Sequence, residues 1–184
     1  MKAVMTQVAQ SFRRVSSRRV LSASLCAILL PLAVLPAHAV TVSNTFQVTA
    51  TISSACTVSG GALNFGAAID PLATATPLDA SSTLTVTCTN TTPYAVALNA
   101  GQNAGGASNF TTRTMKSGSN TLGYQLYLDT GRSTVWGDGT ASSSTKAGTG
   151  TGSAQSLTIY GRIPSLSGVV PGSYTDTVTV TISY

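Results

Sequence analysis

Residues 172–184, at the C-terminus, read Gly-Ser-Tyr-Thr-Asp-Thr-Val-Thr-Val-Thr-Ile-Ser-Tyr. Thr and Ser occupy the odd positions of this stretch from residue 175 to residue 183, whereas apolar and aromatic side chains dominate the even ones. The members of the apolar face are Tyr174, Val178, Val180, Ile182 and Tyr184. Successive side chains of a β-strand point to opposite faces, so this alternation predicts a half-buried strand.

The same alternation recurs through the rest of the chain. Residues 40–52 carry apolar side chains at most even positions and Thr, Ser or Gln at the odd ones. Further alternating runs predict strands at 83–88, 94–98, 122–128 and 157–163, and shorter strands at 63–65 and 113–115. Thr140 to Ser153 has no large apolar residue, and we expect a mobile surface loop there. About six to eight short antiparallel strands with one apolar face each predict an all-β protein, a β-sandwich of immunoglobulin-like size.

The net charge of +5 comes from the first residues of the chain. Residues 1–39 combine a basic stretch that ends at Arg19, an apolar run, and the small residues around Ala39, as in a cleaved secretion signal peptide. The apolar run contains Pro31 and is short for a membrane span, which makes a retained anchor the weaker interpretation. Residues 40–184 then form one domain with five cations and five acids. This balance argues against a nucleic-acid partner.

Two cysteines, Cys56 and Cys88, lie in the part of the chain expected to be exported. An oxidising compartment favours a disulfide between them, worth about 3 to 4 kcal/mol in the chain-entropy model. Two free thiols are the alternative, and a metal site is weaker still because no His accompanies them. Cys26 lies within the apolar run after Leu25, where a lipoprotein signal has a small residue, so we expect no lipid anchor.

The chemistry available to the exported chain is narrow. His38 is the only histidine and leaves with the signal peptide, and the sequence contains no Glu. General acid–base catalysis would fall to Asp or Lys, and no paired-Asp or Ser-Lys motif is present. Asp138 between two glycines is a weak calcium-ligand candidate, although a turn residue explains it as well. We expect neither an enzyme nor a bound cofactor or metal.

Several blocks of sequence resemble, in order, the spore coat protein U domain family. They are Leu63-Asn-Phe-Gly66, Thr85-Val-Thr-Cys88, Tyr94-Ala-Val-Ala-Leu-Asn-Ala-Gly101, Leu122-Gly-Tyr-Gln-Leu-Tyr-Leu-Asp129, Trp136-Gly-Asp-Gly-Thr140, Tyr160-Gly-Arg-Ile-Pro164 and Gly172-Ser-Tyr-Thr-Asp-Thr-Val-Thr-Val-Thr-Ile182. That family includes subunits of archaic chaperone-usher pili of Gram-negative bacteria. The resemblance implies an incomplete immunoglobulin-like β-sandwich that is completed by a donor strand from a neighbouring subunit.

The resemblance also implies partners and site residues. A periplasmic chaperone first fills the groove left by the missing strand, and at the outer-membrane usher the N-terminal strand of the next subunit replaces it. The donor side chains would be Val42, Phe46, Val48 and Ile52. The strand that borders the acceptor groove and pairs with the chaperone would carry Tyr174, Val178, Val180, Ile182 and Tyr184. The implied product is a cell-surface pilus, or fimbria, that supports adhesion or biofilm formation.

Three alternatives stay open from sequence. Residues 40–52 could instead be the first strand of their own sandwich. The chain could be a tip adhesin or carbohydrate-binding module, with loops around Trp136 or Tyr127 as the binding surface. It could also be a small outer-membrane barrel, which the scattered aromatic residues disfavour.

Overall fold

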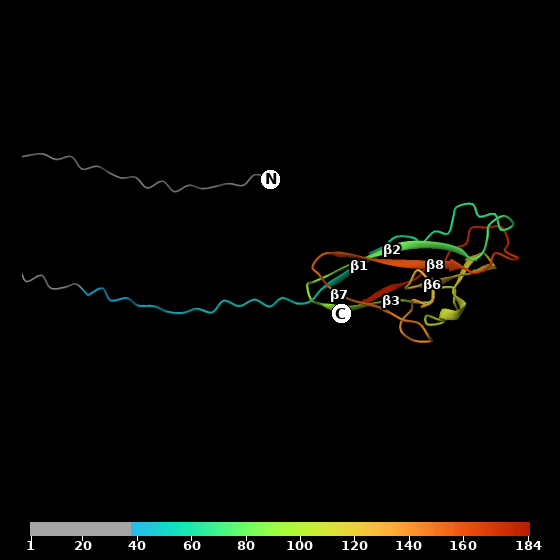
Figure 1. The fold of residues 1–184 in the computed structure, drawn as a ribbon. Helices are drawn as coiled ribbons and strands as arrows, with labels where there is room; N and C mark the ends of the chain where they lie inside the picture. Colours follow the sequence, from blue (N-terminus) through green and yellow to red (C-terminus); the bar gives the residue numbers. More distant parts are fainter. Residues whose placement is uncertain (1–37) are drawn as a thin grey trace, which may run out of the picture. The chain divides into compact units, whose positions relative to one another are not determined.

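The structure is a computed structural model that describes residues 38–184. Most of the predicted signal peptide lies outside the described residues. Residues 38–48 and 49–184 belong to separate units and are described one at a time. The described residues form nine strands and one 3-10 helix, all within the second unit (Figure 1). They are β1 (Cys56–Gly60), β2 (Leu78–Cys88), β3 (Pro93–Leu98), η1 (Phe110–Thr112), β4 (Thr114–Ser117), β5 (Asn120–Gly123), β6 (Gln125–Tyr127), β7 (Lys146–Thr149), β8 (Ala154–Ile163) and β9 (Val180–Ser183).

Four strands form the larger sheet, in the order β1-β2-β8-β6. The two long central strands, β2 and β8, run antiparallel from the pair Leu78↔Ile163 to the pair Thr87↔Ala154 and lie side by side in Figure 1. Leu84, Val86 and Cys88 are buried while the residues between them are more exposed, as the alternation predicts. The predicted strands at 83–88 and 157–163 are therefore confirmed, and both begin earlier than predicted.

The second sheet contains three strands in the order β7-β3-β9. Strand β3 is central and pairs antiparallel with both neighbours, so β9 is an edge strand. The β4–β5 hairpin forms a separate two-stranded sheet, joined to the C-terminal segment by the bridge Lys116↔Thr175. Its strand β4 confirms the short strand predicted around 113–115.

The core lies between the two main sheets. Its fully buried side chains come from both sheets and from the loop after β6, and include Val86, Val96, Leu98, Trp136 and Ile163, each at most 1% exposed. The indole N–H of Trp136 donates to the carbonyl of Val96 at 3.0 Å, which satisfies its one polar atom inside the core. All-β packing of this kind confirms the predicted sandwich.

The disulfide between Cys56 and Cys88 is present, with 4.1 Å between the two Cα atoms. It joins the first residue of β1 to the last residue of β2, which face each other in the antiparallel register. Strand β1 is only five residues long and lies at the edge of its sheet. The covalent link therefore fixes an element that has few hydrogen bonds of its own.

A buried arginine ties loops to the core at the end of the sandwich. Arg113 is 1% exposed and donates to the side-chain oxygen of Gln125 and to the backbone carbonyls of Asn99 and Trp136, each at 2.8 Å. Its guanidinium also lies 5.2 Å from the centre of the Phe110 ring. Burial lowers the pKa of Arg113 to about 10.

Four expectations about strands need correction. The run 122–128 is not one strand, because it breaks at Tyr124 into β5 and β6, which belong to different sheets. Residues 63–65 form no strand, and the stretch 140–153 is not only a loop, because β7 within it pairs with β3. The C-terminal strand is assigned only over β9, and the segment before it is held by the bridge Lys116↔Thr175 and by single backbone hydrogen bonds to Thr177 and Thr179.

Residues 40–52 are not a strand in the structure. The alternative in which they form the first strand of their own sandwich is therefore wrong for this chain by itself, since the first strand, β1, begins at Cys56. Within the described residues, no helix is long and apolar enough to span a bilayer.

Candidate functional site

An apolar groove runs along the C-terminal segment of the second unit. It consists of two adjoining cavities of about 420 Å³ and 750 Å³. Five lining residues are shared by both cavities, which makes them one continuous depression: Ala62, Leu63, Phe65, Met115 and Tyr174. One wall is the segment 61–71 after β1, and the other wall is the segment 169–180 before and into β9.

The floor of the groove is the core itself. Leu84, Leu98, Leu126 and Ile159 lie under the smaller cavity, and Leu122, Ile163 and Leu166 lie under the larger one. These side chains are at most 9% exposed, although the space above them is empty of protein atoms. The floor of this groove therefore consists of core side chains. That arrangement is typical of a β-sandwich that lacks one of its strands.

The C-terminal wall has one paired edge and one free edge. The backbone N–H groups of Asn99 and Gln102 donate to the carbonyls of Thr179 and Thr177, and Thr175 exchanges two backbone hydrogen bonds with Lys116. The odd-numbered residues therefore face β3 and β4, and the backbone groups of the even-numbered ones face the other way. No strand of the described residues pairs with that second edge. Free edges of this kind accept an added strand.

One polar group interrupts the apolar wall. The hydroxyl of Tyr124 donates to Oδ2 of Asp176 at 2.6 Å, and Asn103 donates to Oδ1 from its backbone and from its side chain, at 3.2 and 3.0 Å. Burial and the neighbouring carboxylate raise the pKa of Tyr124. Gly101, with φ of +97°, leaves the space that the Asp176 carboxylate occupies, and a Cβ at that position would collide with it.

Three of the five predicted acceptor residues line the groove: Tyr174, Val178 and Val180. Ile182 lies further along β9 and packs against the core outside the groove lining. Tyr184 lies beyond the end of β9 and is 59% exposed. The sequence analysis missed the opposite wall, where Leu63 and Phe65 are half-buried without belonging to a strand. Their alternation with Asn64 is the available signal, and it predicts a strand rather than an irregular groove wall.

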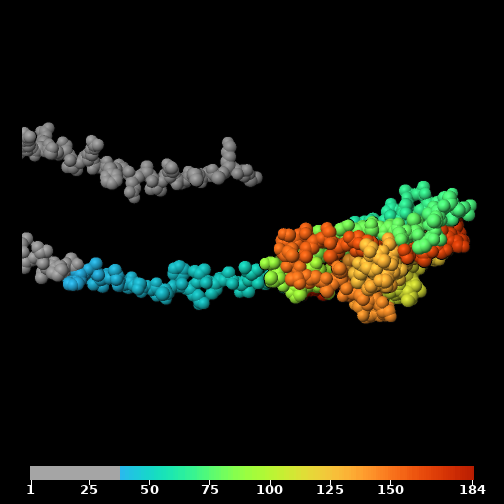
Figure 2. Space-filling view, viewed as in Figure 1, coloured from blue at the N-terminus to red at the C-terminus, as the bar shows by residue number. Residues whose placement is uncertain are grey.

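The predicted donor side chains are exposed and belong to no strand among residues 38–184. Val42, Phe46, Val48 and Ile52 are 93%, 88%, 80% and 90% exposed. The segment 40–52 is the blue-to-cyan stretch of Figure 2. No ionisable side chain lies between residues 40 and 52. A stretch with so many exposed apolar side chains and no charge is uncommon on a protein surface and indicates an interaction segment.

The side chain of Trp136 is an anchor and not a ligand platform. It is 1% exposed and its indole N–H donates to the carbonyl of Val96 in the core. Tyr127 is half-buried on β6. Asp138 accepts a hydrogen bond from Ser108, 30 residues earlier, and two from Thr140 in its own turn, and these hydrogen bonds lower its pKa. No group of three potential metal ligands occurs among the described residues.

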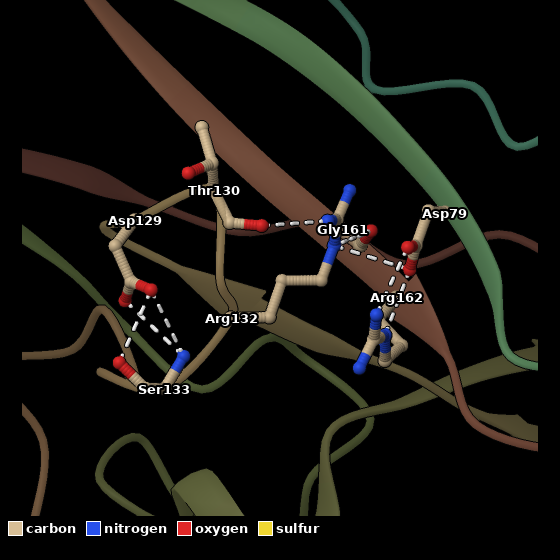
Figure 3. A network of polar contacts seen from close by, with 7 residues as sticks. All are labelled: Asp79, Asp129, Thr130, Arg132, Ser133, Gly161 and Arg162. Atoms are coloured by element: carbon tan, nitrogen blue, oxygen red, sulfur yellow. Dashed lines mark hydrogen bonds and ion pairs between the residues drawn. The ribbon is translucent and has the colours of Figure 1, made fainter.

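A polar network lies on the outer face of the larger sheet (Figure 3). Asp79 on β2 receives two hydrogen bonds from its register partner Arg162, at 2.7 and 2.9 Å, and lies 3.1 Å from Nε of Arg132. The hydrogen bond from Arg162 lowers the pKa of Asp79. Asp129 accepts the backbone N–H groups of Ser133 and Thr134, which lowers its pKa and closes the loop that carries Arg132. The network therefore holds a loop to the sheet.

The fold and the groove define a class: an immunoglobulin-like β-sandwich with one open edge. The chain belongs to the Spore Coat Protein U domain family, whose pattern matches residues 42–181. No curated protein sequence matches the chain.

A similar solved structure is a chain of the CsuC-CsuE chaperone-tip adhesion subunit pre-assembly complex from archaic chaperone-usher Csu pili of Acinetobacter baumannii. The two chains share 25% sequence identity with a TM-score of 0.54. The similarity covers 73% of this chain and 40% of the solved one, so this chain spans less than half the length of that relative.

Proposed function

We propose that this protein is a structural subunit of a cell-surface pilus, exported through the periplasm of a Gram-negative bacterium and assembled by the chaperone-usher pathway. Its role is to polymerise, and through the fibre to support adhesion or biofilm formation. Family membership and the similarity to a chaperone-usher pilus structure support this proposal. The observation that carries it is the open groove beside an unpaired strand edge, in a chain that also exposes a strand-like apolar segment.

Donor-strand complementation connects these two features. The groove of one subunit accepts residues 40–52 of the next, after a periplasmic chaperone has occupied it and the outer-membrane usher has exchanged the two strands. Backbone hydrogen bonds along the free edge provide affinity, and apolar side chains fill the cavities. Burying the four large side chains Val42, Phe46, Val48 and Ile52 is worth about 6 to 12 kcal/mol before the cost of ordering the segment. Such a non-covalent polymer would be long-lived.

The role is structural rather than catalytic. Residues 40–184 contain neither His nor Glu, and the carboxylates Asp79, Asp129 and Asp138 are each engaged in hydrogen bonds that hold loops or sheets together. The groove is lined mainly by aliphatic and aromatic side chains, which suit a β-strand better than a polar substrate.

Deletion of residues 40–49 tests the proposal. The shortened chain keeps the groove, so it should still bind the periplasmic chaperone, but it should not enter a fibre. The measurement is co-purification with the chaperone, together with electron microscopy of surface fibres from cells that produce either form of the chain. A point variant gives a sharper comparison: Phe46→Asp should block assembly, whereas Thr45→Asp, on the opposite face of the segment, should permit it. Fibres of normal length and number from the deletion variant would disprove the proposal.

A further inference from the structure

Each of the two alternating segments carries one polar side chain on its otherwise apolar face. In residues 40–52 the even positions are Val40, Val42, Asn44, Phe46, Val48, Ala50 and Ile52. In the groove wall they are Tyr174, Asp176, Val178 and Val180. Asn44 is thus the only polar residue among the even positions of 40–52. Asp176 carries the only carboxylate among the even positions of 174–180.

Oδ2 of Asp176 has room for a further hydrogen-bond donor when the groove is covered. The carboxylate lines the smaller cavity, and its Oδ1 accepts hydrogen bonds from Asn103 and from the backbone N–H of Thr177, whereas its Oδ2 accepts one hydrogen bond, from the hydroxyl of Tyr124. Each carboxylate oxygen offers about two lone-pair sites, so Oδ2 can accept one further donor. An apolar side chain placed over it would remove water without supplying a hydrogen bond, which is costly. The amide N–H₂ of an Asn supplies that hydrogen bond.

The lengths of the two segments favour one orientation. The groove wall ends at Val180 on one side and near Val169 on the other. If Asn44 lies opposite Asp176 in an antiparallel pair, Val40 lies opposite Val180, Phe46 lies opposite Tyr174, and residues 47–52 continue over the larger cavity. A parallel pair with the same polar match would leave residues 169–171 uncovered. It would also put Ala50 and Ile52 beyond the end of the groove.

We propose that residues 40–52 of one copy lie antiparallel along residues 168–180 of a second copy, and that the contact between Asn44 and Asp176 sets this register. The inference rests on the proposed function and deepens it. A shift of the donor by two residues moves Asn44 onto Val178 or Tyr174 and moves Phe46 or Val42 onto the carboxylate. Both errors are penalised at once, so the polar pair discriminates against slipped registers, which strands with uniform apolar faces permit.

Cysteine cross-linking tests the register directly. The odd residues of both segments face solvent, and opposite positions in the proposed register are Thr41 with Thr179 and Ser43 with Thr177. Opposite residues that do not exchange hydrogen bonds have Cα atoms about 4.5 Å apart, within reach of a disulfide. The full chain carrying Ser43→Cys and Thr177→Cys should form fibres that migrate as a covalent ladder on a non-reducing gel. The matched control, Ser43→Cys with Thr179→Cys, is displaced by two residues and should give no ladder.

The outcomes separate this inference from the proposed function. If the unmodified chain forms no fibres, the proposed function fails and the register fails with it. If fibres form but only the displaced pair cross-links, the register alone is wrong.

A charge exchange tests the role of the polar pair. Asn44→Asp places two carboxylates together and should lower fibre yield about tenfold or more. Adding Asp176→Asn to that variant restores one amide and one carboxylate, and the yield should return to near that of the unmodified chain. Ser43→Asp is the control for added charge on the solvent face and should have little effect. Circular dichroism confirms that each variant folds. Normal assembly of Asn44→Asp, or failure of the folded double variant to recover, would overturn the inference.

Discussion

Residues 40–52 and residues 174–184 have the same alternating pattern and opposite surroundings. The first segment is exposed along its whole length, with Val42 93% exposed, while Val178 and Val180 of the second are half-buried against the core. The second segment is also held on one edge by hydrogen bonds to Asn99 and Gln102, which the first segment lacks. Alternation thus predicts that one face of a strand will be buried, but it does not say whether the burying surface belongs to the same molecule.

Occupation of the groove by residues 40–52 of a neighbouring copy should produce the largest change in stability, because it buries the segment that is exposed in the single chain. Once residues 40–52 occupy the groove of a neighbouring copy, both segments have one buried face and paired edges. We expect assembled chains to unfold at a far higher guanidinium concentration than unassembled ones, because burial of the donor side chains contributes about 6 to 12 kcal/mol before ordering costs. Unfolding of fibres and of the Phe46→Asp chain, followed by circular dichroism, provides the measurement. Equal midpoints would show that the groove stays empty in the fibre.

Removal of the disulfide should cause the next largest loss of stability. The loss should affect the folded domain and leave residues 40–52 unchanged. The variant with Cys56→Ser and Cys88→Ser should lose about 3 to 4 kcal/mol of unfolding free energy, because the unfolded chain is no longer constrained. Proteolysis within residues 40–52 should not change, since that segment is already exposed. Urea unfolding and limited proteolysis of the unassembled chain measure the two quantities. Protection of the segment that depends on the disulfide would contradict the comparison.

A matched pair of valine substitutions should show a smaller difference in unfolding free energy between the two segments. Val180→Ala removes a half-buried side chain that packs against the core and should cost about 1 to 2 kcal/mol of stability. Val48→Ala removes the same atoms from an exposed position and should change the stability of the unassembled chain by less than about 0.5 kcal/mol. Urea unfolding of both variants under identical conditions measures the two free-energy changes. A cost for Val48→Ala equal to that of Val180→Ala would mean that residues 40–52 pack on their own domain.

The smallest predicted effect is a response to acid. The pKa values of Asp79, Asp129 and Asp138 are lowered by hydrogen bonds. A carboxyl group with a lowered folded-state pKa adds stability above its unfolded pKa of about 3.9, and this contribution is lost as the pH falls below that value. The domain should therefore become slightly less stable below about pH 4, whereas residues 40–52 contain nothing that titrates. The variant Asp79→Asn should reduce this pH dependence in urea titrations. An unchanged dependence would show that the ion pair adds nothing measurable to stability.

The sequence predicted much of the sandwich because alternation and burial coincide in its central strands. Leu84 and Val86 on β2, and Val96 and Leu98 on β3, are buried as predicted. Strand β7 could not be predicted, because Lys146–Thr149 has no large apolar side chain and is held by backbone pairing with β3. Tyr124, at which the run 122–128 breaks, donates a hydrogen bond to Asp176, 52 residues further along the chain, and a contact of that range cannot be predicted from local alternation.

The candidate site was predictable on one side only. The alternation in residues 174–180 identified one wall of the groove, since that wall is an extended strand edge. Leu63 and Phe65 form the other wall from an irregular segment whose position depends on packing against Gly161, where a Cβ would clash with both side chains. Asp176 was not recognised as part of the wall, because its polar side chain interrupts the pattern by which the strand was found.

The position of the disulfide also determines how the domain responds to pulling. Cys56 is the first residue of β1, so tension that enters through residues 49–55 meets the covalent link before it reaches the rest of that short strand. The bond passes the force to Cys88 at the end of β2, which is held to β8 by ten successive residue pairs. Peeling β1 away one hydrogen bond at a time is thereby prevented. A pull directed along β2 would load its ten pairs with β8 together, in shear, rather than one after another.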